Sequence, residues 1–322
     1  MISKRPQTAT KACDLAVLYN SECLWHEAHQ IHPERPERLK AIVKSFTNNQ
    51  SPDFYFPTTK AASFKELTLV HDEDYLFSLE SSCLAGKSTF QAQGNYLCED
   101  SFYSIKAAAG LAIEAAKLAL KGKNAFALTR PPGHHAARRT AEGFCFINHA
   151  ALACETIKAE QPDAKVLILD IDVHHGNGTQ KIYEYRPDVF FYSIHISPEV
   201  SYPFTGASEE NGLEKGLDYT LNSPLPDKST GAEWLDRINH KLPSVFTAFS
   251  PDFIILSLGF DAHKDDPTEL MQLEDQDFLA AAELIASLAK KYQIPSTLLL
   301  EGGYDSATLE RLTADFAQYF VY

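Results

Sequence analysis

The sequence has few of the features of nucleic-acid-binding, membrane or secreted proteins. Its 29 Lys and Arg residues face 43 Asp and Glu residues, and the formal net charge of −14 opposes binding to nucleic acid or to an anionic membrane. No apolar run reaches about 18 residues, so we expect no membrane-spanning helix. The stretch MISKRPQTATKACDLAVLYN lacks the continuous apolar segment of a signal peptide. These absences predict a cytoplasmic protein.

The cysteines form no recognisable framework. None of the six belongs to a CxxC pair, a pattern typical of reduced thiols in an intracellular protein. Repeats, low-complexity segments and linkers are absent as well, so we expect one domain across residues 1–322. The six residues are Cys13, Cys23, Cys83, Cys98, Cys145 and Cys154.

Short apolar runs alternate with amphipathic helical patterns along the chain. Hydrophobic residues make up 44% and charged residues 22%, a balance that allows a sizeable core. The runs LAVL, AFAL, VLILD, VFFYSI, FIILSL and STLLL each precede a helical pattern. Continuous Val, Ile and Leu runs divided by amphipathic helices are typical of a parallel sheet covered on both faces. The predicted fold class is therefore α/β.

Polar side chains with metal-binding or acid/base chemistry follow most of these runs. Because the carboxyl ends of parallel strands share one edge of a sheet, we expect these side chains to converge there. They are His134 and His135, then Asp170, Asp172 and His174, then His195, then Asp261 and His263, and finally Tyr304.

Three of these residues, Asp172, His174 and Asp261, suggest a metal site. In an extended chain Asp170, Asp172 and His174 would point to the same side, and Asp261 could join them from another strand end. Two carboxylates and an imidazole suit a divalent cation and leave a position open for water. Any one strand-end Asp could instead cap a helix or accept buried hydrogen bonds. The whole set favours the metal.

Six motifs then make the chain resemble the zinc-dependent histone deacetylase family, in particular its class II and bacterial histone deacetylase-like amidohydrolase members. They are HPERPERL, RPPGHHA, GFCFINHAALA, LDIDVHHGNGTQ, LSLGFDAHKDDP and LEGGY, spread in family order over roughly residues 14–310. The resemblance implies a single-domain arginase/deacetylase fold, with a parallel sheet of about eight strands, helices on both faces and a narrow tunnel for acyl-lysine.

The resemblance also implies a role for each site residue. Asp172, His174 and Asp261 match the ligands of one Zn²⁺ per chain; His134 and His135 match the tandem acid/base pair; Tyr304 matches the catalytic tyrosine. Asp170 matches the carboxylate that orients His134. Asn177 stands behind His135, where class I relatives have an aspartate, so we expect the two histidines to differ in pKa. His175 and His263 are expected to be structural.

Further positions match the substrate tunnel and a structural K⁺ site. Gly143, Phe144 and Tyr202 match the tunnel, and Thr268 replaces the glutamate that polyamine-selective relatives carry. The potassium would be held by Asp170, the backbone of Asp172 and His174, and Ser193 with Ile194. Two departures affect the rim: Phe204 replaces a usual glycine, and GNYLCEDS lacks an acidic residue that often holds the substrate backbone.

The resulting hypothesis is a zinc-dependent amidohydrolase that removes acetyl or related acyl groups from lysine side chains of proteins or peptides. One alternative is an acetylpolyamine amidohydrolase. A second is an acyl-lysine binding module with weak turnover. We expect neither nucleic acid nor membrane as a partner, and a homo-oligomer is compatible with the sequence.

Overall fold

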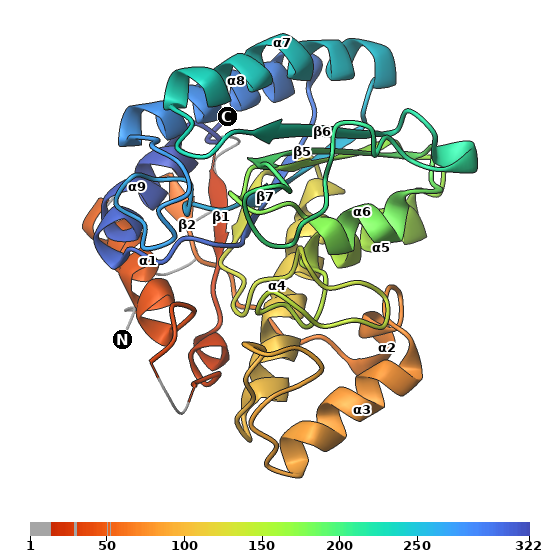
Figure 1. Ribbon diagram of the computed structural model, residues 1–322, viewed down its shortest axis with the longest axis vertical. Helices are drawn as coiled ribbons and strands as arrows, with labels where there is room; N and C mark the ends of the chain where they lie inside the picture. The colour runs from red at the N-terminus through yellow and green to blue at the C-terminus, as the bar shows by residue number, and fades with distance from the viewer. Residues whose placement is uncertain (1–13, 29–30, 50, 52) are drawn as a thin grey trace.

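The computed structural model describes residues 14–28, 31–49, 51 and 53–322 (Figure 1). Residues 1–13 lie outside this part of the chain. They include Cys13, most of the N-terminal stretch that lacks a signal-peptide pattern, and the domain boundary expected at residue 1. The five cysteines within the described part are all unpaired, in agreement with the prediction of reduced thiols. Among the described helices, none combines the length and hydropathy that a membrane crossing needs.

A single parallel sheet of eight strands organises the described chain. The strand order is β2-β1-β3-β8-β7-β4-β5-β6, and every neighbouring pair is parallel. The strands are β1 (Leu15–Leu18), β2 (Phe54–Tyr55), β3 (Ala125–Ala127), β4 (Val166–Asp170), β5 (Val189–Ile196), β6 (Thr220–Leu225), β7 (Phe253–Leu258) and β8 (Ser296–Leu300). The predicted α/β class and sheet of about eight strands are confirmed.

Helices cover both faces of the sheet, as expected for continuous apolar strands. One layer contains α1 (Pro36–Asn49), α7 (Gly231–Phe249), α8 (Asp275–Tyr292) and α9 (Ser306–Gln318), packed in the order α1, α9, α8, α7 (Figure 1). The other contains α4 (Ser101–Ala119), α5 (His149–Glu160) and α6 (Asn177–Tyr183), with α3 (Glu73–Leu84) against α4. The short helices α2 (Phe64–Leu67), η1 (Ser21–Leu24) and η2 (Glu214–Gly216) complete the elements.

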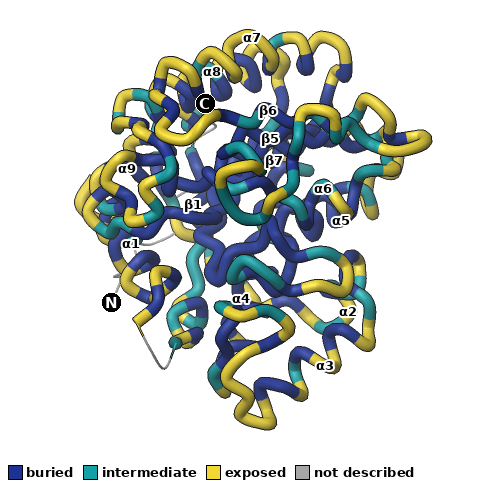
Figure 2. Tube along the Cα trace, in the orientation of Figure 1, coloured by how far each residue is buried: buried dark blue, intermediate teal, exposed yellow. Residues whose placement is uncertain are grey.

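Burial follows from this layering. The central strands β4, β7 and β8 are buried at every residue, and exposed positions concentrate on the outer helices (Figure 2). Helix α4 is Ala-rich and apolar around most of its circumference, which is the pattern of a helix with neighbours on several sides. Because all strands run the same way, the loops after β3, β4, β7 and β8 leave the sheet at one edge.

A buried carboxylate, Glu34, ties the segment before α1 to two of these loops. Its side chain is fully buried and lies between two arginines that are also fully buried. Arg130 donates from Nε to Oε1 at 2.7 Å and from Nη2 to Oε2 at 3.0 Å, and Arg38 donates from Nη1 to Oε1 at 3.1 Å. Arg38 also donates to the backbone carbonyls of Glu301 and Gly303. The loop after β3 and the loop after β8 therefore share one anchor.

Replacement of Glu34 by Gln is expected to lower the free energy of unfolding by about 3 to 5 kcal/mol, because it leaves two buried guanidinium groups without their carboxylate. Urea denaturation at pH 7 measures the change. The matched control is Glu37→Gln in α1: Glu37 pairs with Lys40 at 3.1 Å on the surface, so its loss should cost less than about 1 kcal/mol. Equal losses in the two variants would contradict the anchoring role.

The stabilisation by Glu34 is also expected to depend on pH. Burial opposes ionisation of Glu34, but Arg130 and Arg38 lower its pKa from 4.5 to about 2. The folded state then binds fewer protons than the unfolded chain in that interval, so this stabilisation is complete above pH 4.5 and is lost as the pH falls through about 2. The unfolding free energy of Glu34→Gln should accordingly depend less on pH below 4.5 than that of the unchanged protein.

Candidate active site

The polar side chains singled out in the sequence do meet at the carboxyl edge of the sheet. His134 and His135 lie in the loop after β3, Asp170 ends β4, Asp261 follows β7, and Tyr304 follows β8. These four strands are contiguous in the order β3-β8-β7-β4. The residues are brought together by sheet order, although more than 100 positions separate some of them in the chain.

Asp172, His174 and Asp261 form a compact group of potential metal ligands. One donor atom from each lies within 4.8 Å of the others. The Nδ1 atom of His174 is 3.2 Å from Oδ1 of Asp172 and 3.4 Å from Oδ2 of Asp261. Both aspartates are almost fully buried. Despite burial, which lowers it, these carboxylates raise the pKa of His174 to about 9, so the site strongly favours positive charge.

The donor set and the space around it fit a divalent cation. The outer carboxylate oxygens are held by backbone amides: Gly302 N donates to Asp172 Oδ2 at 2.7 Å and Val173 N donates to Asp261 Oδ1 at 3.0 Å. The buried Oδ2 of Asp261 has no hydrogen-bond partner among the described residues. A Cβ on Gly302 would lie 2.0 Å from that oxygen, so glycine keeps the space beside it open.

The local backbone corrects one expectation about this group. Strand β4 ends at Asp170, and Asp172 and His174 lie in bends after it. Alternation along an extended chain is therefore not what assembles them. Instead Asp170 Oδ1 accepts from the amide of Asp172 at 3.1 Å, and Asp172 Oδ1 accepts from the amide of His174 at 2.9 Å. Two successive Asx-type turns bend the segment after the strand end.

The two tandem histidines have different partners. Their ring centroids are 3.9 Å apart. The Nδ1 atom of His134 is 3.0 Å from Oδ2 of Asp170, whereas Nδ1 of His135 is 2.7 Å from Oδ1 of Asn177. Burial lowers the pKa of both rings. For His134 the carboxylates of Asp172 and Asp170 outweigh burial and raise the pKa to about 10. His135, beside His134 and His174, has its pKa well below 6.5. The expected difference between the two rings is present.

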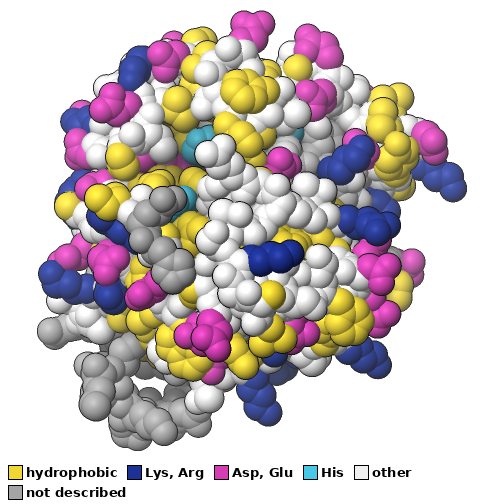
Figure 3. All heavy atoms as spheres, turned by 60° about the horizontal axis from the view of Figure 1, so that its bottom comes forward, with side chains coloured by type: hydrophobic (Ala, Val, Ile, Leu, Met, Phe, Trp, Pro, Cys, Tyr) yellow, Lys and Arg dark blue, Asp and Glu magenta, His cyan; other side chains and the backbone are white. Residues whose placement is uncertain are grey.

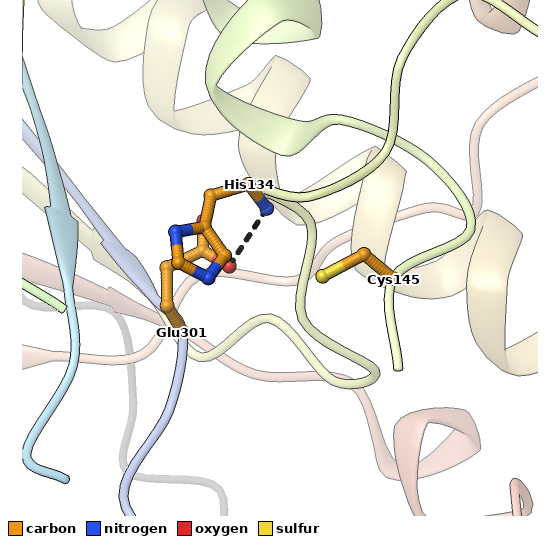
Figure 4. Close-up of side chains that lie close together, drawn as sticks. All are labelled: His134, Cys145 and Glu301. Atoms are coloured by element: carbon orange, nitrogen blue, oxygen red, sulfur yellow. Dashed lines mark hydrogen bonds between the residues drawn. The ribbon is translucent and has the colours of Figure 1, made fainter. Parts of the chain in front are cut away.

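Glu301 and Cys145 complete this environment, and the sequence reasoning missed both (Figure 4). Glu301 Oε2 accepts from the backbone amides of Gly133 at 2.7 Å and His134 at 3.1 Å. Burial raises the pKa of Glu301 to about 7 and keeps the Cys145 thiol protonated by raising its pKa well above 9.0. The cluster of His134, Cys145 and Glu301 is thus poor in anionic ligands. The available signal was the position of Glu301, a carboxylate directly after a buried strand.

Tyr304 is held from three sides. Its amide donates to Asp266 Oδ2 at 2.6 Å, the guanidinium carbon of Arg38 lies 4.8 Å from its ring centroid, and the Phe144 ring meets it edge-on at 6.2 Å. Gly303, with φ at +109°, allows the chain to turn before it. Burial raises the pKa of Tyr304 well above 10.0, so its hydroxyl stays protonated and can donate.

Aromatic side chains pack against His135 and against Tyr304. Tyr202 packs edge-on against His135 at 5.0 Å between ring centroids, and Phe144 meets Tyr304. Gly143 has φ at +56°, and a Cβ there would lie 2.2 Å from Cδ2 of His135. This glycine therefore allows the histidine ring and the aromatic segment to approach. On the face shown in Figure 3, histidine comes to the surface only in small patches among apolar and uncharged atoms.

Other predicted residues lie beside the site with their polar atoms already committed. Thr268 donates through Oγ1 to the Asp261 carbonyl at 3.0 Å, so its hydroxyl holds the loop. His175 contacts Thr205 and Gln180 through its two ring nitrogens, and His263 contacts Asp275, in agreement with structural roles. Phe204 is 67% exposed and has φ at +61°, a conformation that favours glycine.

The chain resembles known proteins over most of its length. Residues 32–320 match the histone deacetylase domain family. Histone deacetylase 15 of Arabidopsis thaliana is 35% identical over 300 residues, which cover 90% of this chain and 53% of that protein. The chain therefore spans about half the length of that relative.

Two solved structures share the whole architecture. The HDA15 HD domain superposes with a TM-score of 0.89 at 32% identity, covering 96% of this chain and 89% of the other. An acetylpolyamine aminohydrolase from Burkholderia pseudomallei superposes with a TM-score of 0.86 at 28% identity, covering 95% and 98%. The fold is thus shared by proteins whose names give different substrates.

The group of potential metal ligands formed by Asp172, His174 and Asp261 can be tested directly. Asp261→Asn is expected to weaken zinc binding by more than about 100-fold, because it removes a charged donor from a set of three. The bound metal is measured by mass spectrometry after equilibration at fixed free zinc. Asp265→Asn is the matched control, since that carboxylate belongs to the same loop but is 54% exposed. A variant at Asp261 that retains full zinc occupancy would exclude this residue as a ligand.

Proposed function

Because the chain belongs to the histone deacetylase family, we propose that it is a zinc-dependent amidohydrolase that removes acetyl or related acyl groups from lysine side chains. The observation that carries the proposal is the placement of one ligand group, Asp172, His174 and Asp261, beside two histidines and a buried tyrosine. Bound there, zinc would polarise the amide carbonyl and lower the pKa of water.

The two histidines are proposed to divide the proton chemistry. His135 is uncharged at neutral pH, since burial and the neighbouring histidines hold its pKa low, and it can accept a proton from the attacking water. The same group can then return the proton to the departing lysine amine. His134, charged through Asp170 and Asp172, supplies positive charge next to the reacting carbonyl. Glu301 holds the loop that carries both rings.

Tyr304 is proposed to donate its hydroxyl hydrogen to the oxygen of the scissile carbonyl as negative charge develops there. The donor needs no movement at the moment of reaction, because the backbone contact to Asp266 and the ring contacts to Arg38 and Phe144 fix its position. Phe144 and Tyr202 would form apolar walls around the four methylenes of a lysine side chain.

A structural potassium ion is proposed near Asp170. Sheet register pairs Asp170 of β4 with Ser193 of β5, so the two segments expected to hold the ion are neighbours. A cytoplasmic location remains a prediction from the sequence, and the proposed partner is an acyl-lysine protein or peptide.

Lysine is favoured over polyamine by the loop after β7. A polyamine would need an anion near the tunnel mouth to meet its distal ammonium, but Thr268 at the relevant position has a hydroxyl bound to the Asp261 carbonyl. Glu269 is exposed and has φ at +53°, and its own carbonyl accepts from Lys228. Similarity to the acetylpolyamine aminohydrolase and the net charge of −14 support the alternative.

A substitution at Tyr304 distinguishes an enzyme from a protein that only binds acyl-lysine. Tyr304→Phe is expected to lower kcat by roughly 100- to 1,000-fold while KM changes little, because one oxyanion donor contributes about 3 to 4 kcal/mol to the transition state. Steady-state hydrolysis of an acetyl-lysine peptide measures both constants, and zinc content and thermal unfolding serve as controls. Retention of more than about a third of kcat would remove Tyr304 from the mechanism and favour the binding module.

Substrate choice is tested by comparing kcat/KM for two classes of amide. Acetyl-lysine peptides are expected to give a higher kcat/KM than N-acetylspermidine or N-acetylputrescine, and Glu269→Leu should leave the ratio unchanged. If acetylspermidine exceeds every peptide by tenfold, about 1.4 kcal/mol of transition-state preference, the enzyme is a polyamine amidohydrolase. In that case a fall in the polyamine rate of Glu269→Leu would identify the anion responsible.

A further inference from the structure

Behind His135 lies a chain of two hydrogen bonds that ends in a carboxylate. Asn177 Oδ1 is 2.7 Å from Nδ1 of His135, and Asn177 Nδ2 donates to Oε1 of Glu142 at 2.7 Å. Glu142 comes directly before Gly143 and is half-buried, with its side chain on a surface cavity that Asn177, Gln180, Glu184 and Glu210 also line. No sequence pattern points to this contact, because Glu142 and Asn177 are 35 positions apart in the chain.

We propose that Glu142 is a positioning residue that acts on His135 through Asn177, an inference that rests on the proposed function. The carboxamide of asparagine has an accepting oxygen at one end and a donating nitrogen at the other. An ionised carboxylate only accepts hydrogen bonds, so Glu142 requires the nitrogen of Asn177 to face it. The oxygen of Asn177 then faces His135, whose Nδ1 must carry the hydrogen.

This arrangement determines which nitrogen of His135 can act as a base. With its hydrogen on Nδ1, the neutral imidazole has its lone pair on Nε2, the nitrogen that Asn177 leaves free. If the amide were reversed, its nitrogen would donate to Nδ1, and the hydrogen of His135 would move to Nε2. A ring in that tautomer could not accept a proton from water through Nε2. Glu142 therefore selects the working tautomer.

The two hydrogen bonds are short and fix the Asn177 amide between its partners. The backbone holds the geometry: Cys145 N donates to the Glu142 carbonyl at 2.9 Å, and Asn177 is the first residue of α6.

The kinetic test compares two substitutions at Glu142 with a matched control. Glu142→Ala is expected to lower kcat about tenfold with KM unchanged, the size of effect that outer hydrogen-bond partners commonly have. Glu142→Gln retains an accepting oxygen but can also turn its donating nitrogen toward Asn177, so it should recover only part of that loss. Glu184→Gln removes a charge from the same cavity, where Glu184 pairs with Lys181 at 2.7 Å, and should leave kcat unchanged. Equal kcat in Glu142→Ala and the unchanged protein would overturn the proposal.

A measurement on the ring separates this inference from the proposed function. Nitrogen-15 NMR of the metal-loaded protein at pH 8 reports the tautomer of His135, whose signal is identified by its absence in His135→Gln. We expect hydrogen on Nδ1 in the unchanged protein and a mixture of tautomers in Glu142→Ala. An identical tautomer in both overturns the role of Glu142, whether or not any acyl-lysine peptide is hydrolysed. Absence of hydrolysis alone would overturn only the proposed function.

Discussion

The structure depends on a cluster of buried carboxyl groups at one edge of its sheet, beside two histidines whose pKa values these groups raise. Four aspartates and one glutamate are almost fully buried around the ends of β4, β7 and β8, namely Asp170, Asp172, Asp261, Asp266 and Glu301. Buried carboxylates are costly unless cations or hydrogen bonds compensate them. Burial and mutual repulsion raise the pKa of Asp266 and of Glu301 to about 7, and one oxygen of Asp261 is left without a partner in the described chain. A divalent cation between Asp172 and Asp261 would compensate these two carboxylates.

Two sets of contacts support the groups at that edge. Close to the ligand group, backbone amides of Gly302 and Val173 fix the aspartates. Further out, Glu34 holds two buried arginines, and one of them reaches the backbone on both sides of Gly302. The loops with the histidines and with Tyr304 thus share supports, which explains how residues from four strands keep one geometry. Rigid placement of this kind is what acid/base and oxyanion chemistry require.

Sequence reasoning identified the elements whose signal is local. Six of the eight strands are continuous apolar runs, and long helices such as α7 and α8 have amphipathic patterns. It did not single out β2, which has only two residues, or β6, whose TLNSPL sequence contains a proline tolerated at the sheet edge. The ligand group was found because its residues follow buried strands. The turns that assemble Asp172 and His174 were not, because they depend on side chain to backbone hydrogen bonds.

The supporting residues were harder to foresee than the reacting ones. Glu301 acts through backbone amides of a loop that lies 168 positions away in the chain, and no periodicity reveals such a pairing. Glu142 and Asn177 are 35 positions apart and meet only because α6 packs beside the loop after β3. Glu34 presents the same difficulty, since it pairs with an arginine 96 positions away. Tertiary structure decides these contacts, whereas the proposed reacting groups follow strand ends that the sequence pattern reveals.

We propose that Asp172, His174 and Asp261 support metal-dependent hydrolysis of acyl-lysine at the sheet edge. The most direct measurement follows acetate release from an acetyl-lysine peptide by the purified protein, before and after removal of metal and during titration with zinc. We expect release to stop in the stripped protein and to return in proportion to added zinc, with an end point of about one ion per chain. Undiminished release by the fully stripped protein would contradict it.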